Sequence, residues 1–231
     1  MLPSTLLTAS QWRRDNQYSR SETAYRLIKD RIVTLDLAPA AVLNESELMD
    51  ELQLGRTPIR EALQRLALEN LVVILPRRGT IVADLNFSDL QKIFELRLEL
   101  EVYAARLAAA RAQPDQVAAM EALFADADNV IRSGDHRQLI VLDHAAHRLL
   151  AEATQNEFLL DTLERLYTHV LRLWHVSLDK VGRLPEAIEE HRNIIAAVKA
   201  GDGERAAAIM RRHVSEFQRE FNNATLMQSG D

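Results

Sequence analysis

The sequence predicts a mostly α-helical chain in two parts, a small N-terminal domain of helices and a β-hairpin followed by an all-helical bundle. Among 231 residues there are only 7 glycines and 6 prolines, and 47% of the residues are hydrophobic, a composition that favours helices. Apolar residues recur at helical spacing through most of the chain. Short β-branched runs between residues 71 and 82 predict the hairpin, and strand signals disappear after residue 86.

Several classes of protein are excluded by composition. The chain has no cysteine, which rules out a disulfide scaffold, a thiolate zinc finger and a catalytic thiol. No apolar run reaches the 18 residues of a membrane-spanning helix. Arg13 and Arg14 follow the first apolar patch, which is the reverse of a secretory signal. We therefore expect a cytoplasmic protein that does not contact a membrane.

The first predicted elements are an arm and two helices. Residues 1–20 have no sustained periodicity and predict a flexible arm. A helix is expected from Glu22, where one stripe carries Tyr25, Ile28, Ile32 and Leu35. Asn44 stands three residues before Glu47, which predicts the N-cap of a short helix that turns Leu48 and Leu52 inward.

A third helix and a hairpin complete the N-terminal domain, residues 21–85. Thr57 followed by Pro58 predicts an N-cap and a first helical residue, and the helix runs to about Glu69, burying Ile59, Leu63 and Leu66. Residues 71–75 and 80–82 predict two strands joined by the turn 76–79. Three short helices and a hairpin are the arrangement of a winged helix-turn-helix domain.

The remaining residues, 86–231, predict a compact helical bundle. Each expected helix is long and amphipathic, and glycine, proline or asparagine separates it from the next. The six expected helices cover residues 88–112, 114–132, 136–154, 156–179, 185–200 and 202–223.

Charge is distributed unevenly along the chain. The net charge is −6, but residues 1–85 carry 11 basic and 11 acidic side chains and sum to zero. Residues 55–80 contain five arginines and only two glutamates. A local basic cluster on an otherwise acidic protein suits a small nucleic-acid footprint, although a solvated charged face is the alternative.

The third helix carries the candidate base-reading residues. Arg60 and Gln64 are four residues apart on the face opposite the buried leucine and isoleucine, and Arg56 stands beside the helix N-terminus. A helix in the major groove reads bases with its N-terminal residues, and arginine offers a bidentate fork to guanine. Thr57 and the first helical N–H groups suit a phosphate.

The turn of the hairpin supplies the candidate wing. Arg77, Arg78 and Gly79 lie at its tip, where two cations suit the DNA backbone or the minor groove and a glycine allows close contact. The expected partner is therefore double-stranded DNA.

Four candidate metal ligands fall on apolar stripes of the bundle. Asp143 and His147 are four residues apart on one stripe, and His191 and His213 lie on the stripes of the last two helices. Burying three imidazoles and a carboxylate without a partner would be costly, and a divalent cation resolves this. Three nitrogens and one oxygen suit Zn²⁺, with Ni²⁺, Mn²⁺ or Fe²⁺ as alternatives. Any one of these histidines, taken alone, is better explained as a hydrogen-bonded core residue.

Arg97 is a further candidate binding residue. It falls on an apolar stripe of the helix over 88–112, where a guanidinium needs an anion. Glu101, one turn later, could satisfy it internally. Alternatively, Arg97 receives the carboxylate of an effector whose other oxygens reach the metal.

The N-terminal domain resembles that of the GntR family of bacterial transcription regulators. The resemblance rests on the segment LGRTPIREAL at residues 54–63, on ENLV at 69–72 and on RRGT at 77–80. It implies DNA contact by Arg56, Thr57 and Arg60, with Arg78 and Gly79 on the wing. Gly55 departs from the family pattern, which usually has serine or threonine there.

The C-terminal domain is similar to the FCD ligand domain of the FadR branch, in its smaller VanR-like form with six helices. The matching positions are Asp143-x-x-x-His147, EHR at 190–192, Gly201-Asp202 and His213. This resemblance implies that the four residues bind a metal and that the domain binds a small organic acid.

Together these expectations describe a homodimeric, metal-containing transcription regulator, more often a repressor in such families, that reads a pseudo-palindromic operator and responds to a small carboxylate. One rival is a metal-dependent hydrolase acting on an organic acid, because such a metal site can activate water. A second rival is a helical adaptor whose winged domain contacts another protein.

Overall fold

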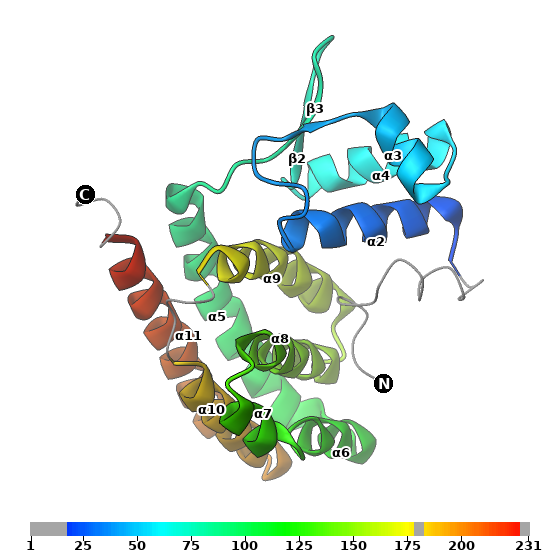
Figure 1. Cartoon of the computed structure of the whole chain (residues 1–231). Coiled ribbons are helices and arrows are strands. Elements are labelled where there is room, and N and C mark those ends of the chain that lie inside the picture. The colour runs from blue at the N-terminus through cyan, green and yellow to red at the C-terminus, as the bar shows by residue number, and fades with distance from the viewer. Residues whose placement is uncertain (1–17, 178–182, 227–231) are drawn as a thin grey trace. The chain divides into compact units, whose positions relative to one another are not determined.

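The structure is a computed structural model that describes residues 18–177 and 183–226 (Figure 1). It divides into two compact units. The first contains the chain up to Asn86 together with Leu171–His175, and the second contains Phe87–Val170 and the chain from Val176 onward. Residues 1–17 of the predicted arm lie outside the described residues. The predicted fold class, a winged helix-turn-helix followed by an all-helical bundle, is confirmed.

The first unit begins with helix α2 (Arg20–Val33), two residues earlier than expected because the hydroxyl of Ser19 caps it by accepting from the Glu22 N–H. Helix α3 (Glu45–Leu52) has the predicted cap, since the Asn44 side chain accepts from the N–H groups of Ser46 and Glu47. Leu35 lies beyond the end of α2 with a φ of 66°, so the predicted helix was too long.

Helix α4 (Arg56–Leu68) begins one residue before the predicted cap. Gly55 is at the N-cap, with no side-chain hydrogen bond, so Thr57 lies inside the first turn and the prediction that it caps the helix was wrong. The predicted buried face is confirmed, because Ile59, Leu63 and Leu66 are at most 2% exposed. They share one hydrophobic core with Ile28 and other side chains of α2.

A small antiparallel sheet completes this unit. Strands β2 (Val72–Leu75) and β3 (Gly79–Val82) form the predicted hairpin, with Leu75 opposite Gly79. A third strand, β1 (Val42–Leu43), pairs with the other side of β3, which gives the order β1-β3-β2. The sequence prediction missed β1, because two residues are too few for an alternating pattern.

The second unit is entirely helical among its described residues. The predicted helix over 114–132 is two helices, because the chain leaves the helical path after Leu123 and starts again at Ala127. The helices are α5 (Phe87–Arg111), α6 (Pro114–Leu123), α7 (Ala127–Ser133), α8 (His136–Ala153), α9 (Glu157–Ser177), α10 (Leu184–Lys199) and α11 (Gly203–Leu226).

Helix α8 lies inside this bundle, against α5, α6 and α10, and α11 runs alongside α5 (Figure 1). The start of α11 approaches α5 closely. A Cβ on Gly203 would lie only 3.1 Å from the Arg106 carbonyl oxygen, so a residue with a side chain would need its neighbours on α5 to shift by a few tenths of an ångström. Within residues 18–177 and 183–226, no helix combines the length and apolar character needed to cross a bilayer.

Candidate nucleic-acid interface and metal centre

Helix α4 exposes the four of its residues that are predicted to contact DNA. Its apolar side is buried in the core, and this rotation leaves the opposite side in solvent. Arg56, Thr57, Arg60 and Gln64 are exposed there. The side chains therefore stand on a protruding helix face, as major-groove reading requires.

The wing tip is also exposed. Arg77 and Arg78 lie in the turn between β2 and β3, and Gly79 is the first residue of β3. Gly79 has a φ of 92°, a conformation that side-chain-bearing residues rarely adopt, so the glycine is required by the turn itself.

The arginines of the first unit differ in whether they have partners. Several form ion pairs within the unit: Arg26 and Arg65 with Glu22, and Arg31 with Glu51. By contrast, the guanidinium groups of three predicted DNA-contacting arginines have no hydrogen-bond or ion-pair partner in the described part of the chain; these are Arg56, Arg77 and Arg78. Uncompensated cations on one side of a domain are free to meet phosphates.

Arg60 is an intermediate case. Its Nε donates to Oε2 of Glu45, the first residue of α3, at 2.8 Å. The Arg60 side chain nevertheless remains 59% exposed. Sequence reasoning did not identify Glu45, because the contact joins residues fifteen positions apart on two different helices.

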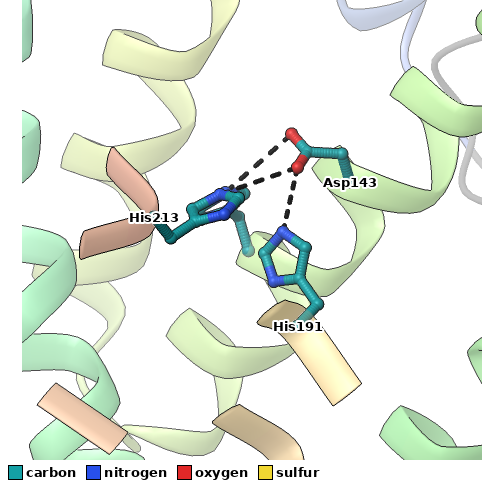
Figure 2. A group of neighbouring side chains, drawn as sticks. Asp143, His191 and His213 are labelled. Atoms are coloured by element: carbon teal, nitrogen blue, oxygen red, sulfur yellow. Dashed lines mark hydrogen bonds and ion pairs between the residues drawn. The ribbon is translucent and has the colours of Figure 1, made fainter. Parts of the chain in front are cut away.

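In the second unit, the four predicted metal ligands meet in one place. Asp143 and His147 come from successive turns of α8, His191 from α10 and His213 from α11. Figure 2 labels three of them, Asp143, His191 and His213. All four are buried, with exposures between 0% and 7%. Their potential ligand atoms lie within 4.8 Å of one another, so the group could hold a metal ion.

The histidines point the same ring atom inward. Nε2 of His147 and Nε2 of His213 are 3.1 Å apart, and Nε2 of His191 is 2.9 Å from Oδ1 of Asp143. Oδ1 of Asp143 is also 3.7 Å from Nε2 of His213. Figure 2 shows the carboxylate facing the two rings of His191 and His213.

Carboxylates hold the outer nitrogens of two of these rings. Oε2 of Glu101, on α5, lies 2.5 Å from Nδ1 of His147, and Oε2 of Glu190 lies 3.0 Å from Nδ1 of His213. A carboxylate beside Nδ1 favours the tautomer that is protonated there, and in that tautomer the Nε2 lone pair faces inward. Such carboxylate–histidine pairs are typical of metal ligands.

This arrangement fits a divalent cation. With both Nδ1 atoms protonated, two Nε2 lone pairs face each other across 3.1 Å, which is unfavourable unless a positive charge lies between them. When two imidazole nitrogens bind the same zinc ion, each at about 2.0–2.1 Å, the two nitrogens lie roughly 3 Å apart.

The charges of the group agree with this. Burial opposes ionisation of Asp143, but the hydrogen bond from His191 and the neighbouring histidines outweigh it and hold the pKa of Asp143 well below its usual value. Burial, together with the nearby His213, lowers the pKa of His191 to about 4. A charged carboxylate and a neutral imidazole are the forms that bind metals.

Arg97 lies next to this group and is 3% exposed. Its Nε donates to Oε1 of Glu101 at 2.5 Å, so the internal pair considered from the sequence is present. Its guanidinium also lies 4.8 Å from the ring centroid of Tyr167. Arg97, Glu101 and His147 therefore form a continuous buried chain that leads to the histidine cluster.

Tyr167, on α9, was missed by sequence reasoning. Its hydroxyl donates to Oδ2 of Asp143. The available signal was a polar-tipped aromatic on the apolar stripe that also carries Leu163 and Val170. A cavity of about 10 Å³ lies beside it, and Glu101 and His147 also line this cavity.

An exposed cationic helix and wing on one unit, and a buried four-ligand group in the other, define a DNA-binding regulator with a ligand domain. Comparison with known proteins gives the same result. Residues 20–82 match the family model "Bacterial regulatory proteins, gntR family", and residues 92–216 match the model "FCD domain". The chain belongs to the GntR family of transcription regulators and carries a C-terminal FCD domain.

Individual relatives are regulators as well. The chain is 27% identical over 197 residues to the HTH-type transcriptional repressor RspR of Escherichia coli (strain K12), covering 85% of this chain and 86% of the relative. It is 29% identical over 204 residues to the HTH-type transcriptional repressor GlaR of the same strain, covering 82% and 90%. These families and relatives are regulators rather than enzymes, which removes the support for a hydrolase.

A solved structure shows the same fold. The chain of E. coli McbR/YncC superimposes with a TM-score of 0.78 at 24% identity, covering 93% of this chain and 100% of that one.

Proposed function

We propose that this regulator is a homodimeric repressor that binds a pseudo-palindromic operator through α4 and the wing. The observation that carries the proposal is the division of the arginines. The exposed faces of α4 and the wing present Arg56, Arg77 and Arg78 without hydrogen-bond or ion-pair partners among residues 18–177 and 183–226, whereas Arg31 and Arg65 are paired. A two-fold dimer would place two such faces on related half-sites. The names of RspR and GlaR support repression rather than activation.

The C-terminal unit would hold a divalent metal, most simply Zn²⁺, through Asp143, His147, His191 and His213. Three nitrogens and one oxygen are ligands that zinc accepts, and Ni²⁺, Mn²⁺ and Fe²⁺ are alternatives with more open positions. When bound, the ion supplies a positive charge that attracts a small carboxylate. Glu101 and Glu190 orient two of the imidazoles for it.

The effector would be a small organic acid, and Arg97, buried beside the histidine cluster, would receive its carboxylate. Arg97 is already paired with Glu101, so the acid must share or displace that contact. The adjacent cavity of about 10 Å³ has room for about one water molecule. An acid would therefore have to enlarge the space between α5, α8, α9 and α11. The required movement of these helices would couple acid binding to the conformation of the domain.

The coupling between acid and DNA would be of the usual size, about 1–3 kcal/mol. The acid would act by changing how the dimer presents its two DNA-binding domains to the operator. As a DNA-binding regulator the protein would act in the cytoplasm.

Operator binding is tested with duplexes selected from a random pool by the full-length protein. Replacing Arg56 with alanine should weaken binding to the selected duplex by roughly 5- to 150-fold, the value of one good bidentate contact. The matched control is Arg31→Ala, which removes an arginine of the same unit that is paired with Glu51, and it should bind nearly as well as the wild type.

Two outcomes would contradict the proposal. Equal affinities for both variants, or binding that does not weaken as salt rises, would favour the adaptor alternative.

Zinc-loaded protein should release the duplex when small carboxylic acids are added, and the acids should be recovered unchanged.

A further inference from the structure

Glu45 and Arg60 form an ion pair that joins α3 to α4. Glu45 is the first residue of α3, and Arg60 lies on the exposed face of α4. Their side chains are 34% and 59% exposed, so the pair is at the surface that would face DNA. A carboxylate there is unfavourable for DNA binding in general, since it repels phosphates and neutralises a cation.

The geometry of the contact suggests what compensates for this. Oε2 of Glu45 accepts from Nε of Arg60 at 2.8 Å, and this is the one hydrogen bond or ion pair of the Arg60 side chain in the described part of the chain. The two terminal Nη groups therefore remain free. A guanidinium is planar, so a carboxylate at Nε restricts the plane of the whole group.

Guanine presents O6 and N7 side by side in the major groove, and the two Nη groups of an arginine match them. We propose that Glu45 is a positioning residue that holds Arg60 for bidentate reading of one guanine in each half-site. The inference rests on the proposed operator binding through α4.

Two neighbouring arginines show that this arrangement is particular to Arg60. Arg31, the other arginine paired with an α3 carboxylate, binds Glu51 through the terminal Nη1, which occupies the fork instead of leaving it open. Arg56 has no carboxylate partner among the described residues, so no such contact restricts its orientation. Of these three arginines, Arg60 alone has a guanidinium whose plane is restricted at Nε while both Nη groups remain available.

The inference predicts opposite effects on affinity and on specificity. Glu45→Ala removes a negative charge near DNA, so binding to random-sequence duplexes should tighten or stay equal. At the same time, the preference of the Glu45→Ala protein for guanine at one position of the half-site should fall by about tenfold. This loss is within the range of one bidentate contact. If Glu45 only stabilised the fold, its replacement would lower both the affinity for random-sequence duplexes and the preference for guanine.

The experiment compares duplexes selected from a random pool by the wild-type protein and by Glu45→Ala, Glu45→Gln and Arg60→Ala. The matched control is Glu51→Ala, which removes a carboxylate of the same helix that is also paired with an arginine. The guanine that Arg60→Ala ceases to select is then replaced by 7-deazaguanine, which lacks the N7 acceptor. Wild-type protein and Glu51→Ala should lose about tenfold in affinity, and Glu45→Ala much less.

Glu45→Gln keeps an acceptor at Nε and should retain most of the guanine preference, which guards against misfolding of the alanine variant. The inference is overturned if Glu45→Ala selects the same guanine as strongly as the wild type and suffers the same loss with 7-deazaguanine. It is also overturned if Glu51→Ala loses the preference equally. Wild-type protein that selects no sequence at all would overturn the operator proposal itself, and this inference with it.

Discussion

Glu101→Gln is the most informative perturbation of the buried chain beside the histidine cluster. Glu101 has Arg97 at 2.5 Å on one oxygen and His147 at 2.5 Å on the other, and its side chain is 4% exposed. Glutamine has nearly the same shape but no charge. The substitution therefore leaves a buried guanidinium without its counter-ion and presents an amide to Nδ1 of His147.

The magnitude follows from two independent considerations. Breaking a buried ion pair by removing one partner costs about 3–5 kcal/mol. Burial raises the pKa of Glu101, but Arg97 and His147 outweigh it and lower the value from 4.5 to about 2. At about 1.36 kcal/mol for each pKa unit, this shift corresponds to about 3 kcal/mol of stability at neutral pH.

The sign of the pH dependence is fixed by the same shift. The folded-state pKa is depressed, so this stability is present above the unfolded value of 4.5 and is lost as the pH falls toward 2. Glu101→Gln should therefore be less stable than the wild type by about 3 kcal/mol at pH 7, and the difference should shrink on acidification. Its Tm should fall by about 6–12 °C.

Urea unfolding at pH 7 and near pH 3, with thermal melts, measures this directly. The control is Glu99→Gln on the same helix, whose side chain is 70% exposed and 3.2 Å from Arg211, and its effect should be about 0.5 kcal/mol or less. If Glu101→Gln is no less stable than Glu99→Gln at pH 7, the reasoning about the buried chain is refuted.

Two further predictions concern other parts of the chain. His191→Ala should lose the bound metal in elemental analysis of protein purified without chelators, whereas His136→Ala, an exposed histidine of α8, should keep it; equal metal in both variants would place the ion elsewhere. Burial and the nearby Asp36 raise the pKa of Asp30 from 3.8 to about 6, so Asp30 destabilises the fold as the pH rises through that interval. Asp30→Asn should therefore gain about 1 kcal/mol at pH 7 after allowance for solvent screening and little at pH 4, and an equal gain at both pH values would contradict the burial argument.

The spacing of apolar residues predicted which face of each single helix is buried. The stripe containing Ile59, Leu63 and Leu66 fixed which side of α4 is buried, and hence which arginines are exposed. The same reasoning placed Asp143 and His147 on the inner face of α8, because burial of a helix face repeats every three to four residues.

Contacts between elements were beyond such reasoning. The pairs of Glu45 with Arg60 and of Tyr167 with Asp143 depend on how two helices cross, which no local pattern encodes. The break after Leu123 has no glycine or proline to mark it, and the start of α4 was misplaced because Thr57-Pro58 is as suitable inside a first helical turn as at a cap.

The position of His213 in the histidine cluster depends on the close packing of Gly203 against α5. His213 follows Gly203 by ten residues on α11, about 15 Å along a helix that rises 1.5 Å per residue. Because the backbone of α11 rests almost directly on that of α5 at Gly203, any bulkier residue there would act as a wedge. A side chain at Gly203 would then shift α11, which carries His213, and would disturb the histidine cluster although it lies far from every side chain of that cluster.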